Sequence, residues 1–266
     1  MYMHQIPGPL AGRVAAAPPV LVFRTVLQGT AHLAWRNRRV RLDEDAWLVL
    51  DAHERCSVQI DPALGTRMLV VAVTQADRQA ALAIDAAGPA DGAFADNLRS
   101  SDGPAGRRLA AIARGRAAGR PEASERGDRI ALVCEALAEE RALRDRAARI
   151  ACVKLATREQ LLRRILLAAD FIASRHDEPL SLDEMARAAS LSRFHFVRLF
   201  SLIHGETPHA FLLKKRTAVA RRHLAVGSAC SEAATRAGFG SRSALFRNLR
   251  KTHLPISGHE PCCLSA

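Results

Sequence analysis

The chain has 266 residues, 48% of them hydrophobic and 25% charged, which is typical of a globular protein and excludes a disordered or fibrous one. It carries 39 Lys and Arg against 27 Asp and Glu, and the net charge of +12 favours polyanionic partners such as nucleic acid or anionic lipid, although GC-biased coding also enriches arginine. Six cysteines without regular spacing exclude a secreted disulfide scaffold and fit reduced thiols in a cytoplasm.

No stretch of the chain is expected to cross a membrane, because such a helix needs about 20 apolar residues. The best apolar candidate, residues 14–27, is interrupted by Pro18, Pro19 and Arg24. The first residues lack a basic region followed by an apolar stretch, so they make a poor secretion signal. We therefore expect a cytoplasmic protein with no membrane partner.

Residues 20–75 are predicted to form short strands with close turns. Gly29 and Asn37 mark two of the turns. Three runs are rich in β-branched, aromatic or other apolar side chains, as strands are: residues 20–27, 47–50 and 67–73. Several short strands with close turns favour an antiparallel sandwich or a small barrel, so we assign residues 1–105 to a β-rich domain.

Residues 106–156 are predicted to form a helical linker. Asp128 is placed to cap a helix that begins at Arg129. Apolar side chains then follow a seven-residue stripe that soon fails: Ile130, Val133 and Leu137. A dimeric coiled coil would use such a stripe, but packing against the chain's own domain is the more common explanation for so short a one.

Two capping-box patterns mark helix starts in the last third of the chain, at Thr157–Gln160 and Ser181–Glu184. Pro179 ends the first of these helices. After the second, a turn at residues 190–192 leads into another helix, for which Ser192 is placed as the cap. This helix turns four apolar side chains inward: Phe196, Leu199, Phe200 and Ile203. A short helix, a turn and a second helix form a helix-turn-helix unit.

A longer helix is expected from Thr207 to about Val226, with Thr207 as cap and Pro208 at its first position. At 1.5 Å per residue it spans about 28 Å, close to the roughly 34 Å between successive turns of the DNA major groove. Basic side chains mark its outward face: Lys214, Lys215, Arg216, Arg221 and Arg222. Residues 231–251 then repeat the short helix, turn and second helix, with Ser241 as cap.

The two units and the segment that joins them resemble the AraC/XylS family of bacterial transcription regulators. The residues that carry the resemblance are Leu180–Ala186, Leu191-Ser192, Phe196, Arg198–Phe200, Gly205–Pro208, Phe211, Leu212, Arg216, Ala220, Ala237–Ser241, Ser243 and Arg247. The resemblance covers residues 161–254 and implies an all-α domain of seven helices whose two recognition helices enter adjacent major grooves. We assign this domain to residues 157–266, with helix-turn-helix units at about 181–204 and 229–252.

The resemblance also implies what the remainder of the chain does. Regulators of this family usually carry a second domain, often a cupin-like β-sandwich, so we expect an α+β chain of two domains. Residues 1–105 would sense a small-molecule effector or mediate dimerisation, and residues 106–156 offer a dimerisation helix. The partners implied are double-stranded DNA, a second copy in a homodimer, and RNA polymerase, with activation of transcription as the expected outcome.

The second unit departs from the family pattern. Leu245 and Leu249 stand where Phe is usual, and Phe246 lies on the outward face, where a small polar residue is common. In residues 253–259 the usual Gly, Pro and Tyr-Arg are missing. We therefore expect the second unit to contribute less specificity than the first.

Two sets of residues are expected at the DNA. The first set reaches bases or the groove, because Arg pairs well with guanine O6 and N7 and apolar side chains contact thymine methyl groups: Arg193, Phe194, Val197, Arg198, Arg242, Ser243, Phe246 and Arg247. The second contacts phosphates through charge or through free N–H groups at helix starts: Ser192, Thr207, Lys214, Lys215, Arg221, Arg222, Ser241 and Arg250. Intramolecular ion pairs, a solvated charged face and, for Phe246, packing against a neighbouring helix are the alternatives.

No catalytic residue, metal site or cofactor is expected, because the chain has no Gly-rich phosphate cradle, nucleophile elbow or His-Glu-x-x-His motif. His32, His53 and Glu54 are weak remnants of a cupin metal site. The C-terminal histidines and cysteines match no zinc spacing: His253, His259, Cys262 and Cys263. Two rival functions stay open, a cupin-type metalloenzyme fused to a DNA-binding module and an adaptor that binds DNA without sequence preference.

Overall fold

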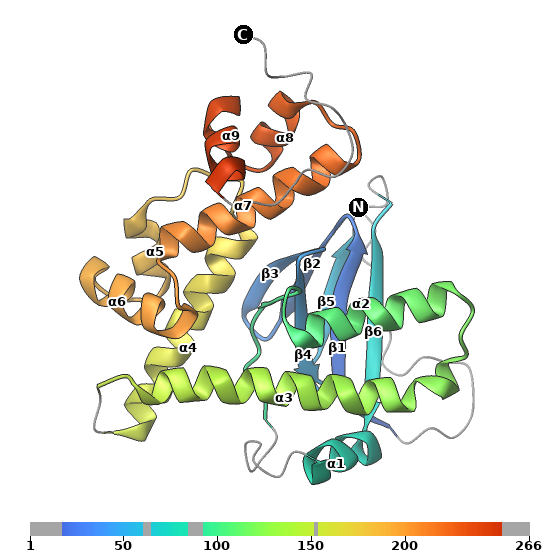
Figure 1. The fold of residues 1–266 in the computed structure, drawn as a ribbon. Helices are drawn as coiled ribbons and strands as arrows, with labels where there is room; N and C mark the ends of the chain where they lie inside the picture. The colour runs from blue at the N-terminus through green and yellow to red at the C-terminus, as the bar shows by residue number, and fades with distance from the viewer. Residues whose placement is uncertain (1–17, 61–64, 85–92, 152–153, 252–266) are drawn as a thin grey trace. The chain divides into compact units, whose positions relative to one another are not determined.

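The computed structural model describes residues 18–60, 65–84, 93–151 and 154–251. The chain divides into two compact units, one that ends at Ser174 and one that begins at Arg175 (Figure 1). Antiparallel sheets lie in unit 1 and the paired helices of the helix-turn-helix region in unit 2, so the expected α+β class is confirmed.

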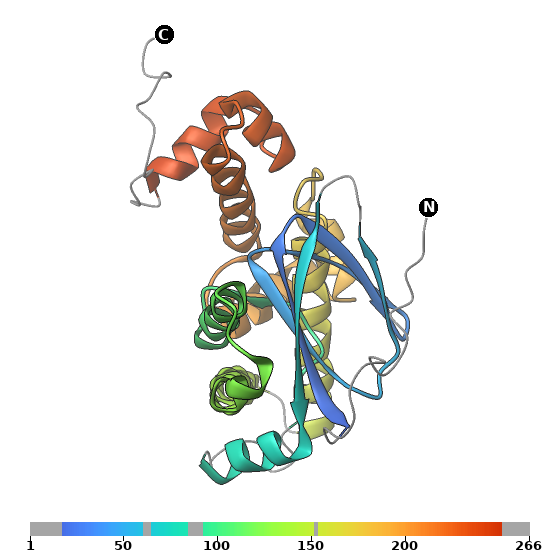
Figure 2. The same ribbon diagram turned by 90° about the vertical axis from the view of Figure 1, so that its right-hand side faces the viewer.

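Unit 1 contains two antiparallel sheets, which are compatible with the expected cupin-like sandwich (Figure 2). One has the strand order β6-β1-β4-β7 and the other the order β3-β2-β5. The predicted turns are present, with positive φ at Gly29 and at Arg36, which precedes Asn37. The strands are β1 (Pro19–Gln28), β2 (Thr30–Trp35), β3 (Arg38–Asp43), β4 (Ala46–Asp51), β5 (Cys56–Ile60), β6 (Arg67–Thr74) and β7 (Arg99–Ser100).

Strand β4 explains the continuous apolar run in the sequence. Its side chains alternate between two cores: Trp47 and Val49 pack with the helices of unit 1, whereas Ala46, Leu48 and Leu50 pack with the other sheet. All five are buried because both faces of the four-stranded sheet are covered. This sheet is therefore the middle layer of unit 1.

The helices of unit 1 are α1 (Gln75–Ile84), α2 (Pro104–Ala117), α3 (Arg126–Ala148) and α4 (Leu155–Ser174). Helices α2 and α3 lie across one face of the four-stranded sheet (Figure 1). Val133 and Leu137, part of the predicted stripe, are buried in this core. The stripe thus packs against the chain's own domain, and residues 106–148 belong to unit 1, whereas the sequence predicts a helical linker over residues 106–156.

Two predicted helix starts are also wrong. α3 begins at Arg126, three residues earlier than predicted, and the Asp128 carboxylate pairs with Arg120 instead of capping the helix. α4 begins at Leu155, so Thr157 lies inside the helix, where it cannot cap it. In both cases the helix extends past a residue that would have been a good cap, because capping preferences are worth only about 1 kcal/mol.

Helix α4 is held to strand β3 and to Leu98, which precedes β7, by polar contacts. The Asp170 carboxylate accepts a hydrogen bond from the Leu98 N–H (2.9 Å) and pairs with Arg38. Burial raises the pKa of Asp170 to about 7, against the opposing effect of Arg38. The Ser174 hydroxyl accepts a hydrogen bond from the Arg41 N–H (3.1 Å). The compact unit therefore ends after α4, whereas the expected domain boundary lies before it.

The secondary structure of unit 2 is α-helical in its described residues, with turns between the helices, and α7 contacts each of the other four helices. Its helices are α5 (Leu182–Ala188), α6 (Arg193–His204), α7 (Pro208–Ala225), α8 (Cys230–Arg236) and α9 (Arg242–Lys251). Within the described part of the chain, no helix combines the length and the apolar character that a membrane span requires.

Candidate nucleic-acid interface

The first helix-turn-helix unit is built from α5 and α6. The predicted capping box is present: the Glu184 N–H donates to the Ser181 hydroxyl (3.3 Å), and the Ser181 N–H donates to the Glu184 carboxylate (2.8 Å). Ser190 turns the chain with a φ of 52°, and Gly205 ends α6 with a φ of 77°. These local signals fix both ends of the unit where the sequence placed them.

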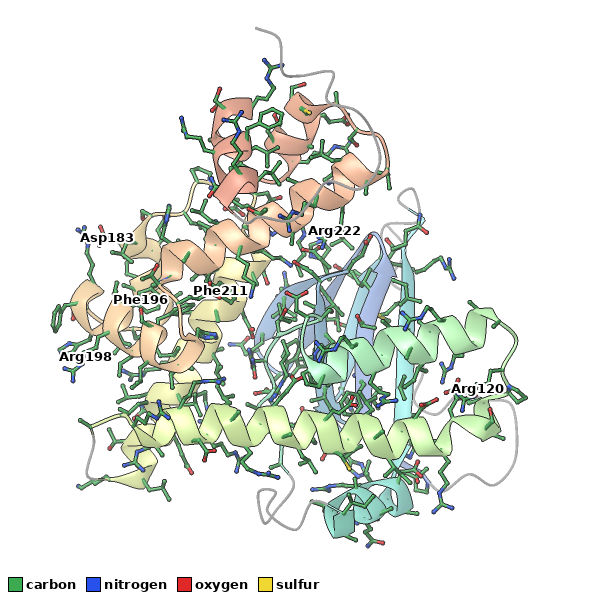
Figure 3. The ribbon with its side chains drawn as sticks, viewed as in Figure 1. Arg120, Asp183, Phe196, Arg198, Phe211 and Arg222 are labelled. Atoms are coloured by element: carbon green, nitrogen blue, oxygen red, sulfur yellow. The ribbon has the colours of Figure 1, made fainter. Side chains whose placement is uncertain are left out.

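An aromatic core holds α6 in place. Phe196, Phe200 and Ile203 are fully buried, and the Phe200 ring lies 5.4 Å from that of Phe196 and 5.5 Å from that of Phe211. In Figure 3, Phe196 and Phe211 lie within the helices of unit 2 whereas Arg198 projects away from them. Because one face of α6 is buried in this core, the opposite face is exposed to solvent.

The outer face of α6 presents Phe194, which is 72% exposed, and Arg198, which is exposed and has no ion-pair partner among the described residues. Val197 is half-buried. Arg193 is exposed but paired: its guanidinium donates to both oxygens of the Asp183 carboxylate. These hydrogen bonds hold the pKa of the Asp183 carboxyl below its usual range.

Helix α7 connects the two units. The Thr207 hydroxyl accepts a hydrogen bond from the Ala210 N–H (3.2 Å), so Thr207 is the predicted cap. The helix has 18 residues, which span about 27 Å. Lys214 is exposed, and Arg221 and Arg222 are half-buried.

Two basic residues of α7 do not lie where the sequence predicted. Lys215 is only 8% exposed, because it shares a helical stripe with the buried Leu212 and Val219, so its assignment to phosphate is wrong. Arg216 donates hydrogen bonds to the carbonyls of His176 and Glu178 (2.6 Å each) and thereby fixes the segment before α5. Burial lowers the pKa of Arg216.

The second unit is built from α8 and α9. Gly238 turns the chain with a φ of 79°, and a Cβ at this position would stand 2.6 Å from the His176 carbonyl oxygen. The Ser241 hydroxyl accepts a hydrogen bond from the Ala244 N–H (3.1 Å), so Ser241 caps α9 as predicted. Ser192, the corresponding residue before α6, makes no such bond; its hydroxyl contacts Nδ1 of His195 (3.0 Å).

The outer face of α9 is basic. Four residues on it are exposed: Arg242, Ser243, Arg247 and Arg250. None of these arginines has an ion-pair partner among the described residues. Phe246 is half-buried against the core of the unit, which contains Leu245 and Leu249. It therefore packs within the protein, which is the alternative given above to contact with DNA. Residues 175–251 hold 14 Lys and Arg against 6 Asp and Glu, so they carry most of the chain's net positive charge of +12.

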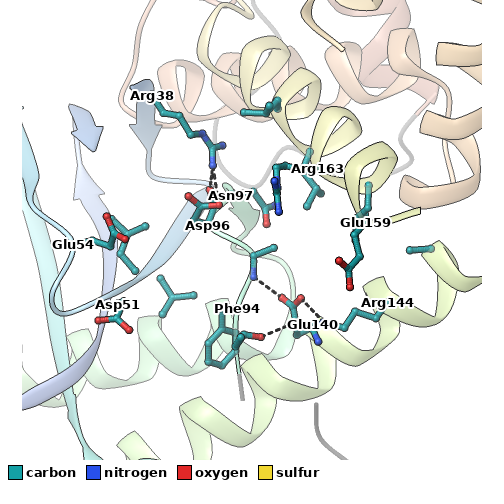
Figure 4. Close-up of a pocket in the computed structure, with 18 of the residues that line it drawn as sticks. Arg38, Asp51, Glu54, Phe94, Asp96, Asn97, Glu140, Arg144, Glu159 and Arg163 are labelled. Atoms are coloured by element: carbon teal, nitrogen blue, oxygen red, sulfur yellow. Dashed lines mark hydrogen bonds and ion pairs between the residues drawn. The ribbon is translucent and has the colours of Figure 1, made fainter. Parts of the chain in front are cut away.

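Unit 1 contains a cavity of about 940 Å³ between the sheet, α3, α4 and the loop at residues 93–97 (Figure 4). Apolar and charged side chains share its wall, among them Phe94 and Arg163. Glu140 of α3, which is 1% exposed, accepts a hydrogen bond from the Ala95 N–H (3.1 Å) and pairs with Arg99. Sequence reasoning did not find this cavity, because its wall combines segments far apart in the chain.

No group of three His, Cys, Asp or Glu side chains among the described residues is placed to hold a metal ion. The C-terminal departures from the family pattern, and the histidines and cysteines near them, lie outside the described residues.

The roles of Asp183 and Arg216 differ from those that the sequence predicts. The sequence pattern assigns Asp183 only to a capping segment and Arg216 to the outward face of α7. A signal for the first was available, since an acidic residue in the first turn of the short helix precedes an arginine at the start of the recognition helix. No local pattern marks the second, because its acceptors are backbone carbonyls about 40 residues earlier in the chain.

A family model described as a helix-turn-helix domain matches residues 185–254. The matched segment includes α6, α7, α8 and α9, which confirms the helix-turn-helix prediction for this region. No curated protein sequence matches the chain.

Solved structures similar to the chain include two of ToxT. ToxT from Vibrio cholerae O395 is 10% identical, with a TM-score of 0.32 over 88% of this chain and 85% of that one. Wild-type ToxT from V. cholerae strain SCE256 with a bound unsaturated fatty acid is 10% identical, with a TM-score of 0.34 over 91% and 87%. The xylose-binding transcription activator xylR is 15% identical, with a TM-score of 0.32 over 48% and 37%.

Proposed function

We propose that this chain, a DNA-binding transcription regulator with an AraC-type helix-turn-helix region, recognises a specific duplex sequence by placing α6 and α9 in adjacent major grooves. The observation that carries the proposal is the set of exposed arginines without ion-pair partners on both helices: Arg198, Arg242 and Arg247. Arginine in the groove pairs with guanine, and α7 provides a rod of about 27 Å between the two helix pairs.

The residues divide into two roles. Base or groove contact is proposed for the exposed residues of the two recognition helices: Arg193, Phe194, Arg198, Arg242, Ser243 and Arg247, with the half-buried Val197 beside them. Phosphate contact is proposed for exposed or half-buried basic residues and for helix starts with free N–H groups: Ser192, Thr207, Lys214, Arg221, Arg222, Ser241 and Arg250.

Selection of bound sites from random DNA tests the proposal. Two short motifs about one helical turn apart are expected in the recovered sites. On that site, Arg198→Ala is expected to lower discrimination at one base by about 1–3 kcal/mol, because a bidentate contact is lost. Lys214→Ala is the control: it should weaken all sequences alike and reduce the slope of log affinity against log salt by about 0.9.

Equal affinity of the wild-type chain for the selected site and for random DNA at the same salt would contradict the proposal and favour an adaptor without sequence preference. Losses from Arg198→Ala that are the same on both DNAs would contradict the assigned role of Arg198 alone.

Activation of transcription through RNA polymerase, a homodimer in solution and action in the cytoplasm complete the proposal. They rest on the likeness of the two helix-turn-helix units to AraC/XylS regulators. Light scattering of the purified chain with and without DNA checks the dimer, and transcription from a promoter with the selected site upstream checks the direction of regulation. A fall in transcription would identify a repressor.

We place the small-molecule effector in the cavity of unit 1, which has the size and the mixed apolar and polar wall of ligand sites. Leu162→Trp would fill part of this cavity. It is expected to remove any ligand-dependent change in transcription while the variant binds the selected DNA as the wild type does. An unchanged response would exclude this cavity as the effector site.

A further inference from the structure

The first recognition helix begins with an arginine whose position is set by a carboxylate on the preceding helix. Arg193 is the first residue of α6, and Asp183 lies in the first turn of α5. Nε of Arg193 donates to one carboxylate oxygen of Asp183 and Nη2 donates to the other. The side chains are 65% and 45% exposed, so the pair lies at the surface beside the proposed DNA-reading face.

This pairing leaves part of the guanidinium available. The group has five N–H donors, and the side-on contact with Asp183 uses Nε–H and one Nη2–H. The two parallel N–H groups at the end of the guanidinium, one on Nη1 and one on Nη2, are not engaged by this contact. That end fork matches O6 and N7 of guanine in the major groove.

The Asp183 carboxylate is also expected to lower the affinity of the chain for DNA of any sequence. Phosphate contacts dominate non-specific affinity, and a negative charge next to an arginine opposes them. Because Asp183 neutralises Arg193, this arginine gains little from phosphate alone. The pair therefore favours a base contact that depends on sequence over a phosphate contact that does not.

The second unit provides a matched comparison within the same chain. The Leu191 N–H bonds to the Ala186 carbonyl (3.0 Å) and the Phe239 N–H to the Ala234 carbonyl (2.9 Å), which aligns α5 with α8 at a spacing of 48 residues. At this spacing Asp183 corresponds to Ser231. Arg242, the first residue of α9, corresponds to Arg193 and has no ion-pair partner among the described residues.

We propose that Asp183 is a positioning residue for base recognition, which holds the Arg193 guanidinium edge-on so that its end fork contacts a guanine. This inference rests on the proposed function. It predicts that the first unit discriminates most strongly at the base pair contacted by Arg193. It also predicts that Arg242, which has no ion-pair partner among the described residues, discriminates between bases less than Arg193 does.

Asp183→Asn in the full-length chain tests this inference on the selected site, on the same site with the guanine replaced, and on random DNA. Discrimination at that guanine is expected to fall roughly tenfold. Affinity for random DNA is expected to rise, with a salt slope steeper by about 0.9, because one opposing charge is removed. The opposite signs on specific and random DNA are a result that loss of folding would not produce.

Glu232→Gln is the matched control, because it removes the same charge from a carboxylate that pairs within α8 with Arg236 (2.8 Å). It should raise affinity for random DNA without changing discrimination at the guanine. Ser231→Asp is the converse variant and should lower affinity for random DNA and sharpen discrimination by Arg242.

A probe with 7-deazaguanine, which lacks the N7 acceptor, should weaken binding of the wild type but not of Asp183→Asn. Lysine has no such fork, so in an Arg193→Lys background Asp183→Asn should not change discrimination at the guanine further. If Asp183→Asn lowers the unfolding temperature, this double-mutant cycle separates positioning of Arg193 from a loss of stability. Unchanged discrimination in Asp183→Asn would overturn the inference. A wild type that does not distinguish the selected site from random DNA would instead overturn the proposed function.

Discussion

In the first helix-turn-helix unit the chain turns at Ser190, and in the second it turns at Gly238, both with positive φ. The core of the first unit contains Phe196 and Phe200, where the second contains Leu245 and Leu249. The first unit is thus stabilised mainly by ring packing, whereas the turn of the second also packs closely against the backbone at His176 and Asp177. The same backbone plan is therefore stabilised in two ways, and each makes a different residue sensitive to substitution.

The largest difference is expected in the two cores. Phe200→Ala should lower the free energy of unfolding of the first unit by about 3–5 kcal/mol, because a fully buried ring with aromatic neighbours is lost. Leu249→Ala removes a smaller side chain that is 8% exposed, and should cost the second unit about 2 kcal/mol. Hydrogen exchange of the α6 and α9 amides measures the opening of each unit. Equal losses of unfolding free energy in the two variants would show that ring packing does not make the first unit different from the second.

The turns should differ next. Gly238→Ala is expected to destabilise the second unit by at least about 1–2 kcal/mol, because a Cβ is strained at this φ and would collide with the His176 carbonyl. Ser190→Gly should change the stability of the first unit by less than about 1 kcal/mol, since relief of strain is offset by a more flexible unfolded chain. Thermal unfolding of both variants is the measurement. An unchanged unfolding temperature in Gly238→Ala would contradict the close approach of Gly238 to the His176 carbonyl.

The caps should show the smallest difference. Ser241→Ala is expected to destabilise the second unit by about 1 kcal/mol, because the Ala244 N–H loses its acceptor. Ser192→Ala should have almost no effect on the first unit, since that hydroxyl bonds to His195 and not to the helix start. Urea unfolding of the two variants checks this, and a larger loss at Ser192 would reverse the comparison.

Local signals in the sequence were sufficient for much of unit 2. Ser181 with Glu184, Thr207 with Pro208, and Gly205 each act within one helical turn, and each marks a helix boundary in the structure. The same reasoning failed at Thr157, where the helix starts earlier. A capping pattern is weaker than the packing of α4 on unit 1, and packing cannot be read from four neighbouring residues.

The candidate interface was predictable where exposure follows from helical periodicity, as for Arg198 and Arg247. Lys215 shows that a charged side chain is not always exposed to solvent. It falls on the buried stripe of α7, a position that a lysine tolerates because its stem is aliphatic. The pairing of Asp183 with Arg193 depends on the angle between two helices, which the sequence pattern does not contain.

The turn of the second unit has one residue more than that of the first, since α5 and α8 align at a spacing of 48 residues but α6 and α9 start 49 apart. The additional room is at Gly240, where no described atom outside Gly240 and its two chain neighbours lies within 4 Å of the position of a Cβ. A photoreactive amino acid in place of Gly240 would sit directly before the Ser241 cap without disturbing it. Irradiation of the bound complex would then mark the nucleotide beside that turn and give the orientation of the protein on its operator.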